Sequence, residues 1–113
     1  MKAESNLHAG DIQNIFMYRC RMARVRVNYP AKYSSLNCPL CENAGPNVIP
    51  HLDNQENLLN CIVIKQNCDA VKNNVVCKYS DIFGTDTQKM NETVKLLVKA
   101  MDTRNELLEQ QLE

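Results

Sequence analysis

The sequence predicts a mostly α-helical protein in which a small cysteine-rich centre is flanked by an N-terminal helix and a long C-terminal helix. Apolar residues recur at helical spacing near each end of the chain. Between those two stretches lie five of the six cysteines and all four prolines, which break regular helices. At 113 residues the chain is the size of one domain, so we expect a single helical domain over residues 11–113 after a disordered lead-in at 1–10.

The N-terminal helix is predicted to begin at Asp11, whose side chain can cap it. Ile12, Ile15 and Phe16 then recur at helical spacing, which indicates about three turns ending near Met22.

The C-terminal helix is the longest predicted element, and it starts after a cap at Thr85 or Asp86. Its apolar residues keep roughly to a heptad rhythm, with the charged residues mostly off the stripe. The stripe consists of Met90, Val94, Leu97, Met101 and Leu108. It must be covered, either by the first helix folding back or by a second copy of the chain in a short coiled-coil dimer. We expect the first arrangement, because Arg104 or Asn105 interrupts the stripe.

Composition limits both the core and the partners. The chain has six aromatic residues and no tryptophan, and a domain with so thin a core often needs a metal or a partner for stability. Thirteen basic and thirteen acidic residues cancel, so no overall field attracts nucleic acid or a membrane. No segment is apolar enough to span a bilayer, and the first eight residues lack the apolar run of a secretory signal. We therefore expect no membrane partner and an intracellular, reducing location, in the nucleus or the cytoplasm.

The centre contains a Cys-x-x-Cys pair, Cys38-Pro-Leu-Cys41. A tight turn of this kind places two thiolates on one side of a loop, and a third cysteine with a nearby histidine can complete a tetrahedron around zinc. Cys61 and His51 follow, so we expect a structural zinc knuckle at about residues 38–61, with zinc as the cofactor. Two other interpretations stay open, namely reduced cysteines packed in a small core and disulfides.

The fourth ligand is the least determined of the set. His51 ranks first, because no other histidine lies near the three cysteines in the sequence. Cys68 ranks second, because seven residues of continuous helix would carry it about 10 Å beyond Cys61. Cys77 ranks third, since the chain would have to return through a loop.

A helix is predicted to carry Cys61. Asp53 can cap it, and Glu56, three residues on, can complete a capping box. Apolar residues follow at positions 58, 59, 62 and 63. On this helix Cys61 would face back toward the Cys-x-x-Cys turn.

A basic cluster lies between the N-terminal helix and the knuckle. Its members are Arg19, Arg21, Arg24, Arg26 and Lys32. Guanidinium groups suit phosphate, so we predict weak, phosphate-directed binding of RNA or DNA by these side chains. On a helix the arginines would occupy two faces. If the chain is extended after Ala23, Arg24 and Arg26 would instead point away from Val25 and Val27. A solvated or ion-paired surface is equally consistent with the pattern.

Two tyrosines, Tyr29 and Tyr33, flank Pro30 and Lys32 within the same region. Their rings could stack on bases or cover the knuckle, and we expect packing.

The sequence contains no catalytic motif that we recognise. It lacks the paired aspartates of two-metal phosphoryl transfer, a Gly-rich phosphate loop, Gly-x-Ser-x-Gly and His-Glu-x-x-His. A thioredoxin-like dithiol needs a strand before it and a helix after it, which Pro39 and the following loop do not supply. We therefore expect neither enzymatic activity nor a small-molecule substrate.

Several short motifs occur in a familiar order over about residues 12–109. They are Phe16-Met-Tyr-Arg-Cys-Arg-Met22, Tyr29, Lys32-Tyr33, Cys38-Pro-Leu-Cys41, Asp53-Asn-Gln-Glu-Asn-Leu-Leu-Asn-Cys61, Tyr79-Ser-Asp-Ile-Phe83 and Arg104-Asn-Glu-Leu-Leu-Glu109. The chain thereby resembles the C-terminal tail of animal non-long-terminal-repeat retrotransposon polyproteins, downstream of the reverse transcriptase domain.

The resemblance implies a zinc knuckle and a role for it. The family tail is similar to a Cys-Cys-His-Cys knuckle whose histidine lies four residues before the last cysteine, where this chain has Asn57. The resemblance therefore implies Cys38, Cys41 and Cys61 as ligands and leaves the fourth position open. It also implies that such tails help the polymerase to engage template RNA or target DNA.

The sequence thus predicts a non-catalytic, zinc-stabilised nucleic-acid-binding fragment derived from a retrotransposon reverse transcriptase. Two alternatives remain, a helical protein-interaction module whose C-terminal helix pairs with a partner, and a degenerate reading frame without selected activity.

Overall fold

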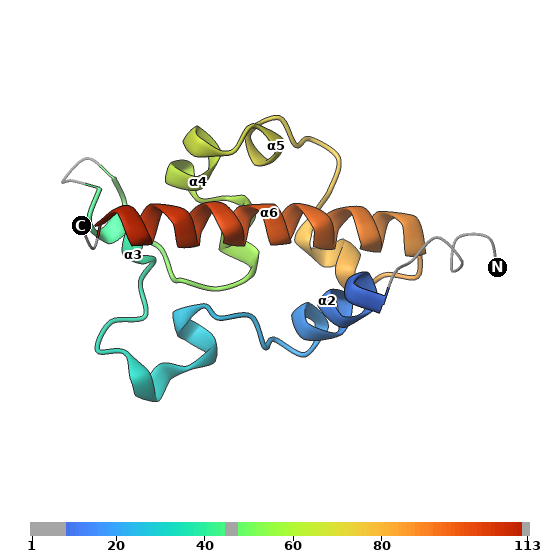
Figure 1. The fold of residues 1–113 in the computed structure, drawn as a ribbon, viewed down its shortest axis with the longest axis horizontal. Coiled ribbons are helices and arrows are strands. Elements are labelled where there is room, and N and C mark those ends of the chain that lie inside the picture. The colour runs from blue at the N-terminus through green and yellow to red at the C-terminus, as the bar shows by residue number, and fades with distance from the viewer. Residues whose placement is uncertain (1–8, 45–47, 112–113) are drawn as a thin grey trace.

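A computed structural model describes residues 9–44 and 48–111 of the chain. These residues are mostly helical and contain no β-strand, which confirms the predicted fold class (Figure 1). The elements are α2 (Ala9–Arg19), η1 (Arg26–Asn28), η2 (Pro30–Lys32), α3 (Pro39–Glu42), η3 (Glu56–Leu59), α4 (Ile62–Asn67), α5 (Asp69–Lys72), η4 (Tyr79–Phe83) and α6 (Thr87–Gln111). Among these described helices, none is both long and apolar enough to cross a membrane.

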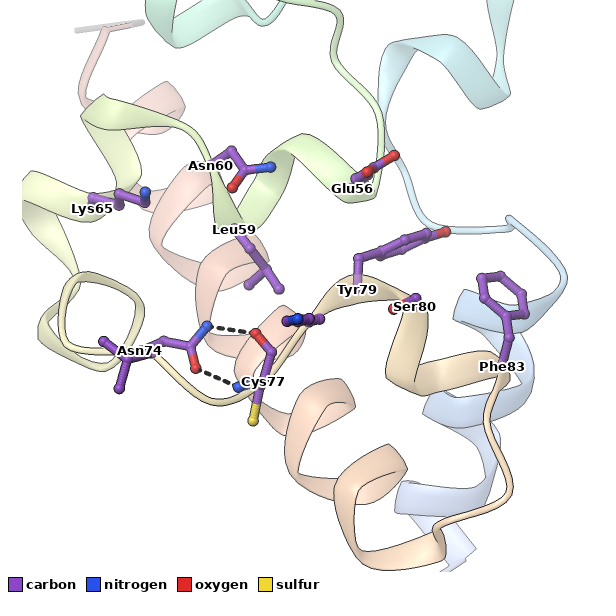
Figure 2. A pocket seen from close by; sticks show the side chains of 11 residues that line it. Glu56, Leu59, Asn60, Lys65, Asn74, Cys77, Tyr79, Ser80 and Phe83 are labelled. Carbon is purple, nitrogen blue, oxygen red and sulfur yellow. Dashed lines mark hydrogen bonds between the residues drawn. The ribbon is translucent and has the colours of Figure 1, made fainter.

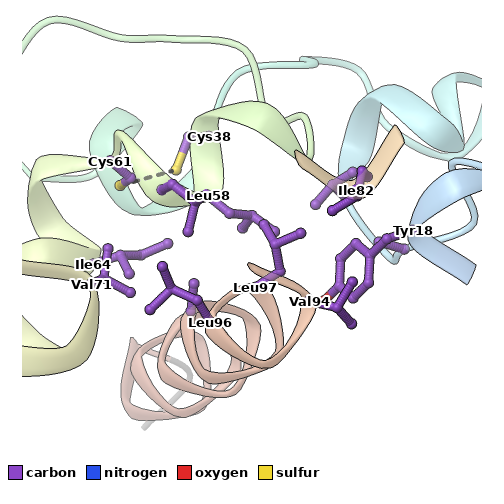
Figure 3. Packing of buried hydrophobic residues seen from close by; sticks show 14 of the residues in the cluster. Tyr18, Cys38, Leu58, Cys61, Ile64, Val71, Ile82, Val94, Leu96 and Leu97 are labelled. Carbon is purple, nitrogen blue, oxygen red and sulfur yellow. Dashed lines mark hydrogen bonds between the residues drawn. The ribbon is translucent and has the colours of Figure 1, made fainter. Parts of the chain in front are cut away.

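The long helix α6 is the axis around which the shorter elements pack. In Figure 1, α2 lies beside the first half of α6, α4 and α5 lie on its other side, and α3 lies near its C-terminal end. Within the stripe on α6, Val94 and Leu97 are almost inaccessible to solvent, and Met90, Met101 and Leu108 are partly buried. Figure 3 shows its side chains meeting Leu58 of η3 and Ile82 of η4. The N-terminal helix therefore covers part of the stripe, as predicted, and the central elements cover the rest.

Helix α2 begins at Ala9, two residues inside the predicted lead-in, and ends at Arg19, before the predicted end. The remainder of the lead-in, residues 1–8, lies outside the described residues. The early end has a local cause, because Arg21 adopts a left-handed conformation with φ of 55°. The Arg21 amide then donates to the Tyr18 carbonyl (3.2 Å) and the Met22 amide to the Met17 carbonyl (2.9 Å). This pair of bonds is a Schellman motif, which usually has glycine where this chain has Arg21.

Replacing Arg21 with glycine should therefore stabilise the domain. A side chain in the left-handed region costs roughly 1 kcal/mol, and glycine avoids that cost. We expect Arg21→Gly to raise the free energy of unfolding by about 0.5–1 kcal/mol in urea denaturation. Arg21→Ala removes the guanidinium but keeps Cβ, so it is the matched control. Equal stability of the two variants would contradict the assignment of strain to this residue.

The chain after Arg21 leaves the helix but does not form the extended segment that the second interpretation of the basic cluster predicts. Ala23 and Val25 are buried while Met22 and Arg24 are exposed, but the Val25 amide donates to the Ala23 carbonyl at 2.8 Å in a tight turn, and Arg26 and Val27 lie in η1. The cluster is therefore not one cationic helix.

The predicted continuous helix from Asp53 is wrong. The chain instead forms the short helix η3, breaks at Asn60 and Cys61, and restarts as α4. Asp53 is not a helix cap, because its carboxylate is engaged elsewhere. It accepts hydrogen bonds from the Arg26 backbone amide at 2.7 Å and from Arg104 of α6.

The Asp53–Arg104 pair ties α6 to the centre of the chain. Arg104 donates from two nitrogens to the two carboxylate oxygens, at 2.6 and 3.3 Å. The Arg104 and Asp53 side chains are only 7% and 2% exposed. The arginine that interrupts the apolar stripe in the sequence is thus buried, because a carboxylate neutralises it.

Gln55 is a second buried polar link, 3% exposed and hydrogen-bonded on both sides of its amide. Its oxygen accepts from the Ala23 amide and from Asn28, both at 3.2 Å. Its nitrogen donates to the Tyr18 carbonyl at 2.8 Å and to the Tyr79 hydroxyl at 2.9 Å. The Gln55 side chain therefore joins the end of α2, the segment that contains Ala23 and Asn28, and η4.

Loss of the Gln55 amide should destabilise the fold. Gln55→Leu leaves the buried Ala23 amide without its acceptor, and an orphaned buried donor costs about 1–3 kcal/mol. We expect a loss of roughly 2 kcal/mol in the free energy of unfolding, measured by urea denaturation. The exposed Gln66 of α4 offers the matched control, and Gln66→Leu should change stability by less than about 0.5 kcal/mol. Similar effects of the two substitutions would show that the Gln55 network is energetically unimportant.

Candidate functional site

Four ligand atoms converge at the centre of the fold, from Cys38, Cys41, His51 and Cys61. All four lie within 4.8 Å of one another. The Cys61 Sγ atom is 3.4 Å from Cys41 Sγ and 4.0 Å from Cys38 Sγ, and His51 Nε2 is 3.2 Å from Cys41 Sγ. Zinc bonds of about 2.3 Å to sulfur and about 2.0 Å to nitrogen imply tetrahedral edges of about 3.8 and 3.5 Å. The two sulfur–sulfur separations lie on either side of 3.8 Å and the sulfur–nitrogen separation is slightly shorter than 3.5 Å, so the arrangement could hold one metal ion.

Local structure explains how residues distant in sequence meet here. Cys38 precedes the first turn of α3, Pro39 supplies the fixed φ of that turn, and Cys41 lies in it. An isolated antiparallel bridge joins Asn37 to Leu52. Within it the Cys38 amide donates to the His51 carbonyl at 2.7 Å, which places the histidine beside the turn.

The break between η3 and α4 places the third thiol, that of Cys61, in the cluster. Cys61 is the N-cap residue of α4 and is extended, with φ of −68° and ψ of 120°. Cys61 therefore reaches the cluster from a helix start, and not from the middle of the helix that the sequence predicts.

A hydrogen bond fixes the tautomer of His51. Its Nδ1 lies 2.9 Å from the Leu52 carbonyl oxygen, which can only accept, so Nδ1 carries the proton. The lone pair of Nε2 therefore faces the Cys41 sulfur, as a metal-binding imidazole requires.

Asn57, at the position where the resembled family has histidine, is not one of the four ligands. Its side-chain amide donates to the same Leu52 carbonyl at 2.9 Å. Asn57 thus supports the carbonyl that orients His51. Sequence reasoning missed this role, because the link passes through a backbone atom.

The three thiols differ in acidity. The hydrogen bond with Cys61 and burial raise the pKa of Cys38, and burial raises the pKa of Cys41. The hydrogen bond from Cys38 lowers the pKa of Cys61, which is therefore the most acidic of the three. A divalent cation would displace protons from the thiols of the cluster, so its affinity would fall as the pH falls.

Cys68 and Cys77, the other candidates for the fourth ligand, lie outside the cluster. Cys68 separates α4 from α5. Asn74 holds the backbone of Cys77 through two hydrogen bonds of 2.9 Å, to its amide and its carbonyl (Figure 2). The structure thus places His51, and neither of these cysteines, beside the three predicted thiols.

Cys77 also lines a surface hollow of about 610 Å³. Figure 2 shows Leu59 of η3 and Tyr79 of η4 among its walls. Its described lining includes one carboxylate, Glu56, and no histidine. These walls therefore offer neither paired carboxylates nor a further metal-binding set.

Two members of the basic cluster are used inside the fold. Arg19 donates to the carbonyls of Ile82 and Gly84, which end η4. Arg26 donates to backbone carbonyls of residues 35 and 37 and pairs with Glu42 at 3.2 Å. Both guanidinium groups thus have partners within the fold, and their predicted contacts with phosphate stay a prediction.

Arg24 and Lys32 remain at the surface and meet around one cavity of about 260 Å³. Tyr29 and Tyr33 complete its lining, and both rings are exposed, so the expectation that they cover the knuckle is wrong. Within the described ranges, neither cation has an ion-pair partner. Arg21 is exposed too, but it borders a separate small cavity near Gln55.

Comparisons with protein families, with curated proteins and with solved structures find no significant match to this chain.

Proposed function

We propose that this chain is a non-catalytic, zinc-stabilised nucleic-acid-binding module derived from the tail of a retrotransposon reverse transcriptase. Three thiols and one imidazole form a donor set that suits zinc. Because four protein ligands fill a tetrahedron, no position is left for a substrate, and the metal would have a structural role. The sequence resemblance supports the origin and the class of partner.

The observation that carries the binding function is the surface cavity lined by Arg24, Tyr29, Lys32 and Tyr33. Two cations without acidic partners can attract the phosphates of RNA or DNA. Exposed aromatic rings beside them can contact bases. Such a surface predicts salt-sensitive binding with little sequence preference.

Fluorescence anisotropy with labelled RNA and DNA across a salt series tests this function. We expect affinity to fall linearly on a log-log plot, and Arg24→Gln and Lys32→Gln each to reduce the slope by about 0.7–0.9. Lys72→Gln removes one charge from an exposed position at the end of α5 and is the matched control, with a slope close to that of the native chain. Binding that is absent, or that does not change with salt, would rule the function out.

A further inference from the structure

We propose that the cavity lined by Arg24, Tyr29, Lys32 and Tyr33 prefers single-stranded nucleic acid, with one base stacked on Tyr29 and the adjoining phosphate bound by Arg24 and Lys32. This inference rests on the proposed function and names its substrate class. The inference depends on a difference between the two tyrosines: cations contact the ring of Tyr33, whereas the structure gives no cation contact for the ring of Tyr29 within the described residues.

The Tyr29 ring is exposed and held in place. Tyr29 is 42% exposed, so its ring is open to a ligand. Its hydroxyl donates to the Met22 carbonyl at 3.2 Å, so the ring is anchored at its polar tip. Pro30 follows directly and restricts the backbone. Tyr29 is therefore a preorganised platform that needs little ordering when a base stacks on it.

Cations already engage the Tyr33 ring. The Arg26 guanidinium carbon lies 5.2 Å from its centroid and the Lys32 ammonium nitrogen lies 5.9 Å from it. These contacts make Tyr33 a support for the cations, and they leave Tyr29 as the ring that can accept a base.

The charges next to Tyr29 are uncompensated. Glu42 pairs with Arg26, so this nearby carboxylate does not neutralise Arg24 or Lys32. The Arg24 guanidinium can bind two phosphate oxygens at once, and the Lys32 ammonium can add a third contact. The two cations and the platform line one cavity, as a nucleotide's base and phosphate require.

The size of the cavity favours a single strand. About 260 Å³ lies just below the range typical of pockets for drug-sized ligands, so it suits one nucleotide unit. In a duplex each internal base is stacked on both faces and would have to be unstacked first, at an energetic cost. A single strand offers unstacked bases at no such cost.

Anisotropy with a single-stranded oligonucleotide and a hairpin duplex of matched charge tests the preference. We expect the native chain to bind the single strand about tenfold more tightly. Tyr29→Leu should abolish this difference by weakening single-strand binding alone, whereas Tyr29→Phe, which keeps the ring, should preserve it. Phe16→Leu, which removes an exposed aromatic ring outside this cavity, is the matched control and should leave the ratio unchanged. Circular dichroism and urea midpoints establish that each variant is folded.

Tyrosine emission gives a second measurement, because the chain has no tryptophan. Single-stranded DNA should quench part of this emission, and Tyr29→Leu should lose that part while Phe16→Leu keeps it. Tight binding with a strand preference that does not depend on Tyr29 would overturn this inference and leave the proposed function standing. Failure to bind either oligonucleotide would overturn both.

Discussion

A strong chelator is expected to unfold the centre of this domain, because the proposed zinc ion would be removed from the cluster of Cys38, Cys41, His51 and Cys61. Cys38, Cys41 and Cys61 belong to the same buried core as the stripe on α6. A structural zinc ion contributes apparent free energies of about 10–16 kcal/mol in zinc-finger peptides, as much as the whole stability of about 5–15 kcal/mol expected for a domain. Circular dichroism should therefore show a loss of helical signal with chelator and its recovery when zinc is added.

The same result is expected for Cys61→Ser without chelator. Cys77→Ser is the matched control, because Cys77 is a free thiol outside the cluster and should leave the helical signal unchanged. A native chain that keeps its full helical signal and its urea midpoint in chelator would contradict a structural role for the metal.

Breaking the Asp53–Arg104 pair is expected to have the second-largest effect. Asp53→Ala strands the Arg104 guanidinium in a site where it is 7% exposed, and it also removes the acceptor of the Arg26 amide. Removing one partner of a buried pair typically costs about 3–5 kcal/mol. We expect a loss of that size in urea denaturation, provided that zinc is present at a constant free concentration.

The exposed pair of Arg26 and Glu42 is the matched control. The Arg26 and Glu42 side chains are 21% and 40% exposed, so solvent screens their attraction. Glu42→Gln should therefore cost less than about 1 kcal/mol. In the double variant Asp53→Ala with Arg104→Met, the loss should be smaller than for Asp53→Ala alone, since no buried charge remains. Additive losses for the two positions would show that the pair is not energetically coupled.

Local sequence patterns predicted the parts of the fold that depend on interactions between residues close in sequence. The heptad rhythm from Met90 to Leu108 lies within one helix, and burial of that stripe is what holds the helix in place. The Cys-x-x-Cys spacing likewise predicted a turn, because Pro39 fixes the first residue of α3. The choice of His51 followed from its proximity in sequence to three thiols.

The remainder depends on contacts between distant residues. Asp53 occurs where a helix cap is expected in the sequence, but its carboxylate binds the Arg26 amide and Arg104, which is 51 residues away. Arg19 is likewise predicted as a phosphate ligand from the sequence. In the structure it donates to the carbonyls of Ile82 and Gly84, which lie more than 60 residues further along the chain. The end of α2 escaped prediction because the left-handed residue is Arg21, where glycine is the usual signal.

The metal content of the purified protein, after dialysis against a weak chelator, tests the central claim most directly. We predict one equivalent of zinc per chain in the native protein and in Cys77→Ser. Loss of that equivalent is predicted for Cys41→Ser and for His51→Ala. A folded native chain without zinc, or His51→Ala that retains a full equivalent, would contradict the assignment of Cys38, Cys41, His51 and Cys61 as a structural zinc site.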